Sequence, residues 1–238
     1  MGRRPRYKGT PIHGLLVVDK PLGVGSTEVV RRVRYAAGDV KTGHAGTLDP
    51  LASGVVICCL GNATKSVEAL MGQTKVYETA IDLSGFTATD DAEAEVEPVA
   101  CAQAPDRSAV DAVLAQHLGT IMQTPPAYSA LKLQGKPAYE RVRAGEKVEL
   151  AARPVRIDAI EVQRYQWPYL EVVVTCGRGT YLRSLARSVG EALGTGGYLR
   201  GLRRTAVGPY CVENATPLDA LPDPVTQDHL LPAPVAER

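Results

Sequence analysis

The carboxylate with the clearest chemical potential is Asp49, the one acidic residue in a stretch of glycines and apolar residues that covers positions 43–65. Pro50 restricts the backbone of Asp49 to an extended or turn conformation, and Gly46 and Gly54 permit backbone conformations that other residues avoid. A carboxylate presented on such a loop can act as a nucleophile or as a general base. The alternative is a solvated aspartate in a surface turn that leads into a core strand.

Two apolar runs are expected to support this loop. Residues 55–60 form a short, continuously apolar run rich in β-branched side chains, which predicts a strand buried on both faces. Residues 14–20 form a similar run that ends at Pro21, and this run predicts a second buried strand followed by a turn.

Helices and further strands alternate along the rest of the chain. Strands are predicted over residues 75–83, 155–162 and 169–176. Helices are predicted from an N-cap at Ser26 or Thr27 to Gly38, over residues 64–70, and from Leu182 to Gly194. A further helix is predicted after an N-cap at Ser108, with Val110, Val113, Leu114 and Leu118 on one face. This mixture predicts a mixed α/β (α+β) fold.

Three other side chains each have an ordinary structural interpretation when they are read from the sequence alone. Tyr77 lies near the start of a predicted strand, where tyrosines commonly pack against their neighbours. Arg183 lies in the first turn of a predicted helix, where arginines are commonly solvated or paired with an acid. His44 has the alternative of a turn histidine, and no cluster of acids, cysteines and histidines in the surrounding sequence indicates a metal site.

The charges are segregated along the chain. The formal net charge is only +1, which argues weakly against a nucleic-acid partner. However, residues 76–106 contain no Lys or Arg, whereas basic residues are concentrated in residues 132–156 and 178–204. These two basic regions can contact phosphates, with ordinary solvated faces as the alternative.

A set of motifs occurs in a fixed order along the chain. They are Gly-Leu-Leu-Val-Val-Asp-Lys-Pro-Leu-Gly-Val-Gly-Ser-Thr at 14–27, Gly-His-Ala-Gly-Thr-Leu-Asp-Pro at 43–50, Lys-Val-Tyr-Glu at 75–78, Gln-Thr-Pro-Pro-Ala-Tyr-Ser-Ala-Leu-Lys at 123–132, Gly-Arg-Gly-Thr-Tyr-Leu-Arg at 177–183, and Leu-Arg-Gly-Leu-Arg-Arg-Thr-Ala-Val-Gly at 199–208. Together they resemble the bacterial-type tRNA pseudouridine(55) synthases. The resemblance implies the pseudouridine-synthase fold, with a central mixed, mostly antiparallel sheet flanked by helices. It also implies that the chain isomerises uridine 55 in the T-loop of transfer RNA.

The resemblance assigns roles to individual residues. Asp49 stands at the catalytic aspartate of the family, and Arg183 at the arginine that forms an ion pair with it. Tyr77 is expected to stack on the uracil. The remaining substrate contacts implied by the motifs are made by His44, Tyr181 and Leu202.

Contacts to the RNA backbone are expected from basic residues in two regions. Residues 124–151 resemble an insertion that folds over the T-loop, and we expect this insertion to act as an RNA clamp. The expected phosphate contacts are Lys132, Arg141, Arg203 and Arg204.

The expected organisation is a basic N-terminal arm (1–13), a catalytic domain (14–215) and a Pro-rich tail (216–238). The tail resembles the lead-in to the RNA-binding C-terminal domain of the family, most of which we expect to be absent. Five cysteines without a Cys-x-x-Cys pair favour a reducing cytoplasm over a disulfide framework. We expect a monomer that binds the T-arm of transfer RNA and needs no metal, cofactor, nucleotide or membrane.

The resemblance is incomplete in places. Ala94 stands near a position where the family often has glycine, and Arg187 and Ser188 stand where acidic residues are common. A non-catalytic RNA-binding module or tRNA-folding chaperone on the same fold is the main alternative. A hydrolase that uses Asp49 and His44 is a third, but the sequence offers it neither a second carboxylate nor a serine nucleophile motif.

Overall fold

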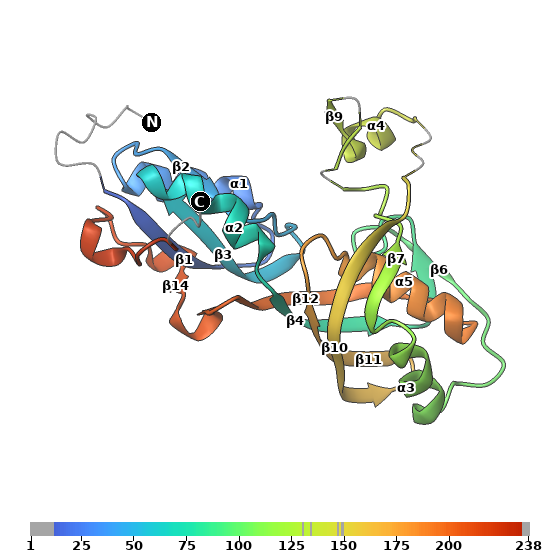
Figure 1. Cartoon of the computed structure of the whole chain (residues 1–238). Helices are drawn as coiled ribbons and strands as arrows, with labels where there is room; N and C mark the ends of the chain where they lie inside the picture. Colours follow the sequence, from blue (N-terminus) through green and yellow to red (C-terminus); the bar gives the residue numbers. More distant parts are fainter. Residues whose placement is uncertain (1–11, 130, 134, 147, 149, 235–238) are drawn as a thin grey trace. The chain divides into compact units, whose positions relative to one another are not determined.

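The computed structural model describes residues 12–234 except 130, 134, 147 and 149. The chain folds into two compact units (Figure 1), one made of the residues up to Tyr77 and from Arg203 onward, the other of Glu78–Leu202. Strands β4 (Lys75–Asp82) and β12 (Tyr198–Val207) each begin in one unit and end in the other.

The first unit is built on two long antiparallel strands. β1 (Gly14–Lys20) pairs with β3 (Ala52–Leu60) over its whole length, and the strand order is β14-β1-β3-β12. β14 (Thr216–Pro217) adds to β1 in parallel. The remaining elements are α1 (Ser26–Ala36), β2 (Thr42–His44), α2 (Val67–Gly72), β13 (Tyr210–Cys211) and four 3₁₀ turns, Gly61–Ser66, Val212–Asn214, Leu218–Ala220 and Gln227–His229.

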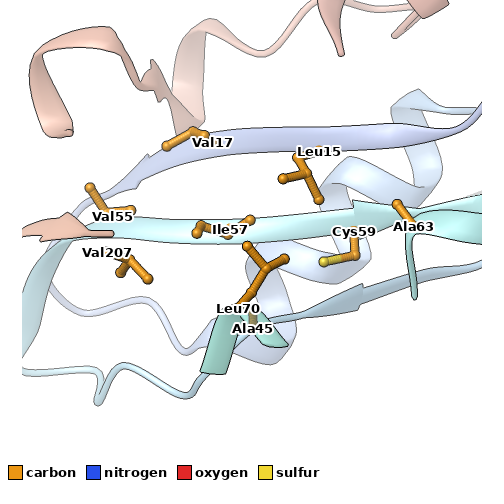
Figure 2. Packing of buried hydrophobic residues seen from close by; sticks show 9 residues of the cluster. All are labelled: Leu15, Val17, Ala45, Val55, Ile57, Cys59, Ala63, Leu70 and Val207. Atoms are coloured by element: carbon orange, nitrogen blue, oxygen red, sulfur yellow. The ribbon is translucent and has the colours of Figure 1, made fainter. Parts of the chain in front are cut away.

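The core of this unit explains why β1 and β3 are apolar throughout. Alternate residues point to one face, where Leu15, Ile57 and Cys59 pack with Leu70 of α2 (Figure 2). The residues between them, such as Val56, are equally buried. The prediction of strands buried on both faces is therefore confirmed for β3 and, apart from half-buried Asp19, for β1.

The second unit contains the strand order β12-β4-β11-β10-β7. β10 (Arg153–Gln166) is antiparallel both to β11 (Tyr169–Cys176) and to β7 (Gly119–Gln123). Two helices, α3 (Arg107–Ala115) and α5 (Leu182–Leu193), pack against each other, and β5 (Gly85–Thr87) forms a separate hairpin with β6 (Val96–Pro98). The mixed α/β, mostly antiparallel architecture is the one expected from the sequence.

Residues 124–151 depart from this sheet. They contain the short strands β8 (Lys132–Leu133) and β9 (Lys136–Pro137), which form a hairpin, and the helix α4 (Ala138–Arg143) (Figure 1).

The predicted helices are present, but some of their ends differ. The N-cap of α1 is Gly25 rather than Ser26 or Thr27, because the Ser26 side chain is engaged elsewhere. The N-cap of α3 is Asp106, whose carboxylate accepts a hydrogen bond from the Ala109 amide at 2.8 Å, and Ser108 donates to the same carboxylate.

Two further expectations about helices need correction. The helix predicted over residues 64–70 begins as the 3₁₀ turn, and only Val67–Gly72 is α-helical. Leu118 lies beyond the end of α3 and is 44% exposed, so it does not belong to the buried face of that helix.

Candidate functional site

Asp49 lies on the loop that connects β2 to β3, in the first unit. The loop turns at Gly46, whose φ of 105° favours glycine, and closes with a hydrogen bond from the Ala52 amide to the Asp49 carbonyl at 3.0 Å. Gly54 is required at the base of the loop, because a Cβ there would lie 2.1 Å from the carbonyl oxygen of Arg204. Asp49 is half-buried, whereas Pro50 is exposed.

Ser26 holds the residue that precedes Asp49. Its hydroxyl donates to the Leu48 carbonyl at 2.9 Å and accepts from the Leu48 amide at 2.8 Å. Both Ser26 and Leu48 are buried. The first residue of α1 therefore fixes the backbone next to the candidate catalytic carboxylate.

Arg204 supports the loop from another direction. Its guanidinium donates to the carbonyls of Val55 at 2.7 Å, Gly46 at 3.3 Å and Thr47 at 3.4 Å, and the residue is only 2% exposed. We expected Arg204 to contact RNA phosphates, but in this structure its charge is buried and bound to the protein. Its environment is that of a support for the loop rather than of an RNA contact.

The neighbouring Arg203 has a different environment. It forms a two-bond ion pair with Asp19, with nitrogen–oxygen distances of 2.8 and 3.2 Å, and also donates to Ser53 Oγ at 3.2 Å. Its side chain is 36% exposed. Arg203 is accordingly accessible to a phosphate, whereas Arg204 is not.

Lys20 is a further support that the sequence analysis did not single out. The residue is fully buried, and its ammonium donates to the carbonyls of Val24 at 2.7 Å, Pro21 at 2.9 Å and Ala52. Burial lowers the pKa of Lys20 to about 8, against the opposing influence of the negative charge on Asp49. The sequence signal that could have identified Lys20 is its position as a lysine at the end of an apolar strand.

His44 and Tyr77 also belong to the first unit. His44 lies in β2, and burial of its ring lowers its pKa, an effect that the nearby Arg204 charge increases and the Gly46 backbone opposes. This direction favours the neutral form of the imidazole. Tyr77 lies in β4 and is 9% exposed.

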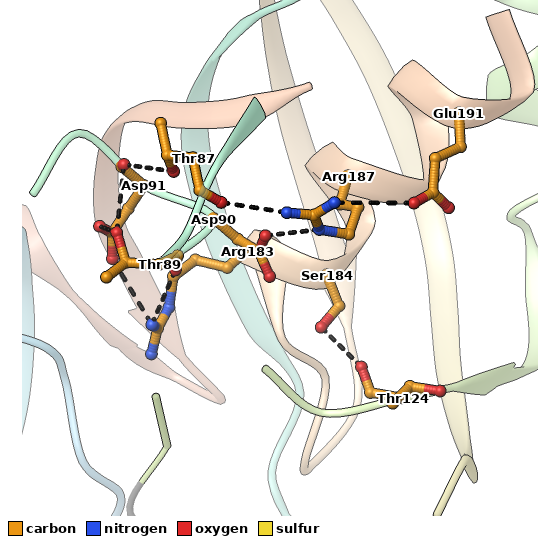
Figure 3. Close-up of polar contacts among 9 residues, drawn as sticks. All are labelled: Thr87, Thr89, Asp90, Asp91, Thr124, Arg183, Ser184, Arg187 and Glu191. Atoms are coloured by element: carbon orange, nitrogen blue, oxygen red, sulfur yellow. Dashed lines mark hydrogen bonds and ion pairs between the residues drawn. The ribbon is translucent and has the colours of Figure 1, made fainter. Parts of the chain in front are cut away.

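In the second unit, Arg183 projects from the first turn of α5 onto the loop that follows β5 (Figure 3). It is 7% exposed, its Nη1 donates to the Thr89 carbonyl at 3.2 Å, and the same nitrogen lies 3.5 Å from Asp91 Oδ2. Asp91 is itself held through Oδ1, which accepts from Thr89 Oγ1 at 2.5 Å and from the Glu93 amide at 3.1 Å. Arg183 thus has a fixed acidic partner within its own unit.

Tyr181 occupies the N-cap position of α5 and has no side-chain cap of its own. Instead, the buried amide of Gln123 accepts from the Tyr181 N–H at 2.8 Å and donates to the Tyr181 carbonyl at 3.1 Å. The Arg153 guanidinium lies 5.2 Å from the centre of the Tyr181 ring. Gln123 is another supporting residue that the sequence analysis did not identify, although it opens one of the motifs.

The other expected contacts are more scattered. Leu202 is half-buried in β12, Arg141 on α4 pairs with Glu146 at 2.7 Å, and Lys132 lies in β8. The side chain of Lys132 lies outside what the structure describes, as does most of the basic N-terminal arm, residues 1–11. The structure groups Asp49, His44 and Arg204 around one loop.

Within the described part of the chain, no group of three or more His, Cys, Asp or Glu residues could hold a metal ion. Among the same residues, none of the helices has the length and apolarity needed to cross a membrane.

Comparisons with known proteins identify the family. Residues 33–182 match the TruB family pseudouridylate synthase N-terminal domain, and residues 183–232 match the tRNA pseudouridylate synthase B C-terminal domain. The chain therefore belongs to the TruB family of pseudouridylate synthases and is an isomerase.

Curated relatives cover most of the chain. It is 50% identical over 214 residues to tRNA pseudouridine synthase B of Corynebacterium aurimucosum, covering 88% of this chain and 72% of the relative. It is 46% identical over 228 residues to the protein of the same name from Burkholderia mallei, covering 94% and 72% of the two chains.

Two solved structures share the fold. A Cbf5–Nop10–Gar1 complex matches with a TM-score of 0.67 and 30% identity, over 87% of this chain and 52% of that chain. An H/ACA ribonucleoprotein bound to a substrate RNA containing 2′-deoxyuridine matches with a TM-score of 0.64 and 28% identity, over 87% and 51%. The chain thus spans about half the length of these two structures.

Proposed function

We propose that the chain converts uridine 55 in the T-loop of transfer RNA to pseudouridine, with Asp49 as its catalytic residue. The observation that carries this proposal is that the Asp49 loop is held by three buried side chains, Ser26, Lys20 and Arg204. The names of the curated relatives, tRNA pseudouridine synthase B, support transfer RNA as the substrate.

The reaction needs one well-placed carboxylate. The glycosidic bond from N1 to the sugar breaks, the uracil turns, and a new bond forms from C5, which loses its proton while N1 gains one. No atom enters or leaves overall, so the chemistry requires no co-substrate. Asp49 acts either as a nucleophile or as the base that removes a proton. A loop that is fixed before RNA binds reduces the reorganisation required in the transition state.

The remaining residues receive their roles from their motifs. The target uridine must leave the base stack to react, and Tyr77 offers an aromatic face to the extruded base. Tyr181 and Leu202 line the uracil pocket, His44 contacts the RNA, and Arg183 pairs with the catalytic carboxylate. Among the basic residues, Arg203, Arg141 and Lys132 contact the RNA backbone.

A non-catalytic RNA-binding module on the same fold is the competing function. Binding to phosphates draws on basic residues and gains nothing from a half-buried carboxylate. Burying the charges of Lys20 and Arg204 costs free energy. A loop that must hold a catalytic carboxylate in place gives a reason for that cost, whereas RNA binding alone does not.

Incubation with an unmodified transfer-RNA transcript, followed by mapping of pseudouridine at nucleotide resolution, tests the proposal. We expect one modified position, in the T-loop. Asp49→Asn should bind the transcript with nearly wild-type affinity and form no pseudouridine. The matched control is Asp111→Asn, which removes an exposed carboxylate that pairs with Arg107 on α3 and should retain full activity. Modification at another position would disprove the site assignment, and an active Asp49→Asn variant would disprove the role of Asp49.

A further inference from the structure

Arg187, one helical turn beyond Arg183 on α5, contacts both β5 and the loop that follows it. Its Nε donates to Asp90 Oδ1 at 2.5 Å, and its Nη2 donates to the Thr87 carbonyl at 3.0 Å (Figure 3). Its guanidinium carbon also lies 4.7 Å from the centre of the Phe86 ring. The contact to Glu191 on the same helix is longer, at 3.8 Å. Arg187 therefore binds the loop more closely than it binds its own helix neighbour.

The loop that Arg187 holds is the loop that holds Arg183. Thr89 and Asp91 supply the carbonyl and the carboxylate that contact the Arg183 guanidinium. Asp90 lies between them in sequence, and its carbonyl accepts a hydrogen bond from the Leu199 amide of β12 at 3.0 Å. Asp90 thus links α5 to β12 while its neighbours bind Arg183.

The charges in this cluster are balanced in pairs. Arg183 and Arg187 are four residues apart on one helix, so their side chains lie on the same side and repel each other. Two adjacent acids face them, with Asp91 on Arg183 and Asp90 on Arg187. Asp90 is 8% exposed and has a φ of 60°, a backbone conformation that Asp and Asn tolerate better than most residues. Such a buried carboxylate is costly without its cation.

We propose that Arg187 is a positioning residue for the reaction. It fixes residues 86–91, the end of β5 and the start of the loop that follows it, on α5, and this segment holds the Arg183 guanidinium in the orientation that it needs in the transition state. The inference rests on the proposed function only in taking Arg183 as the partner of the catalytic carboxylate. Arg187 itself touches neither the substrate nor Asp49 in this role.

This role predicts a loss in the chemical step rather than in RNA binding. A misplaced guanidinium stabilises the transition state less, whereas the phosphate contacts are made by other residues. A displacement of about 1 Å of a positioned group can cost about 100-fold in rate. We therefore expect Arg187→Met, which retains the stem of the side chain but not its charge, to lower kcat about 10- to 100-fold and to leave KM within about threefold of wild type.

The test is a double-mutant cycle measured on a transfer-RNA transcript, with melting midpoints recorded for every variant. The variants are Arg187→Met, Asp90→Asn and the double substitution, and Asp90→Asn is chosen because asparagine tolerates the backbone conformation at this position. If the pair acts as one unit, the double variant has the same kcat as the slower single variant. The control is Arg107→Met, the same substitution in an exposed ion pair on α3, which should leave kcat unchanged.

Arg187→Lys guards against a folding artefact, because it retains the charge but lacks the planar fork of two nitrogens with which Arg187 binds Asp90 and Thr87. Its kcat should fall between those of wild type and Arg187→Met. The proposal is overturned if Arg187→Met has wild-type kcat, if only KM changes, or if the two single effects multiply in the double variant. An inactive wild-type protein would instead reject the proposed function itself, so the two failures are distinguishable.

Discussion

The hydroxyl of Ser26 forms two hydrogen bonds with the backbone of Leu48, one as donor at 2.9 Å and one as acceptor at 2.8 Å. These bonds fix the backbone amide and the backbone carbonyl of Leu48, the residue that precedes Asp49. A serine at the start of a helix usually caps that helix, but here Gly25 occupies the N-cap and the serine serves the neighbouring loop.

Ser26→Ala should therefore weaken both the fold and the reaction. It leaves a buried amide and a buried carbonyl without their partner, which costs about 1–3 kcal/mol in the free energy of unfolding. We also expect kcat to fall about tenfold or more, because the loop is less well held. Urea denaturation and steady-state kinetics measure the two effects. The control is Ser108→Ala, which removes an exposed hydrogen bond to Asp106 at the start of α3 and should leave kcat unchanged. Unchanged kcat in Ser26→Ala would show that the loop is fixed without this serine.

Arg203 and Arg204 are adjacent but should respond oppositely to substitution by methionine. Arg204→Met deprives three carbonyls of a buried donor, and each costs about 1–3 kcal/mol where water cannot replace it. Arg203→Met removes a partly exposed ion pair with Asp19, which contributes only about 0–1 kcal/mol. It should instead weaken RNA binding and reduce its salt dependence.

Each of these variants is the control for the other. Chemical denaturation should show that Arg204→Met is the less stable variant. RNA titrations at several salt concentrations should show that Arg203→Met is the variant with the lower affinity. If Arg204→Met is as stable as wild type but binds RNA poorly, the result would support the phosphate contact that the sequence predicts for Arg204.

The stability of the protein should depend on pH through Lys20. Its pKa in the folded protein, about 8, lies below the ordinary value of 10.5, so between these pH values the unfolded chain binds more protons than the folded one. Stability contributed by this lysine must then rise with pH across that window.

The difference in free energy of unfolding between wild type and Lys20→Met isolates this effect from the other groups that titrate there. We expect the difference to grow in favour of wild type from pH 8 to 10.5. It should be flat below pH 7, where the lysine is protonated in both states. A difference that stays constant across the whole range would contradict the lowered pKa.

Much of the fold follows from local patterns, whereas the supports of the site do not. The continuous apolar runs predict β1 and β3, and helical spacing followed by Gly194, which has a φ of 68°, predicts α5 and its end. By contrast, Ser26 binds a residue 22 positions away, and Arg204 binds Val55 149 positions away. Local periodicity contains no information about such partners.

The arginine pair in β12 illustrates the same limit. Successive side chains in a strand point to opposite faces, so Arg203 and Arg204 must lie on opposite faces of β12. Which one is buried depends on the register of β12 beside the Asp49 loop, and that register is set by tertiary packing. The sequence also shows that Arg187 departs from the family pattern. It does not show that Arg187 pairs with Asp90, because the two residues are 97 positions apart.

Tyr77 allows stacking to be separated from proton transfer. Tyr77→Phe retains the aromatic face and removes the hydroxyl, whereas Tyr77→Leu removes both. Extruding a uridine costs a few kcal/mol of stacking, and an aromatic face restores roughly 1–3 kcal/mol per base. If Tyr77 acts by stacking, the phenylalanine variant retains substantial activity and the leucine variant loses most of it. Tyr35→Leu, at a tyrosine of α1 that is 41% exposed, controls for a general effect of removing an aromatic residue.

The other outcomes are equally informative about Tyr77, provided that melting curves show each variant to be folded. Because Tyr77 is only 9% exposed, the leucine variant also loses packing, and its activity must be measured well below its melting midpoint. Equal inactivity of both variants would implicate the hydroxyl as a proton donor or acceptor in the isomerisation. Near wild-type activity of both would show that Tyr77 packs within β4 and that another group holds the extruded base.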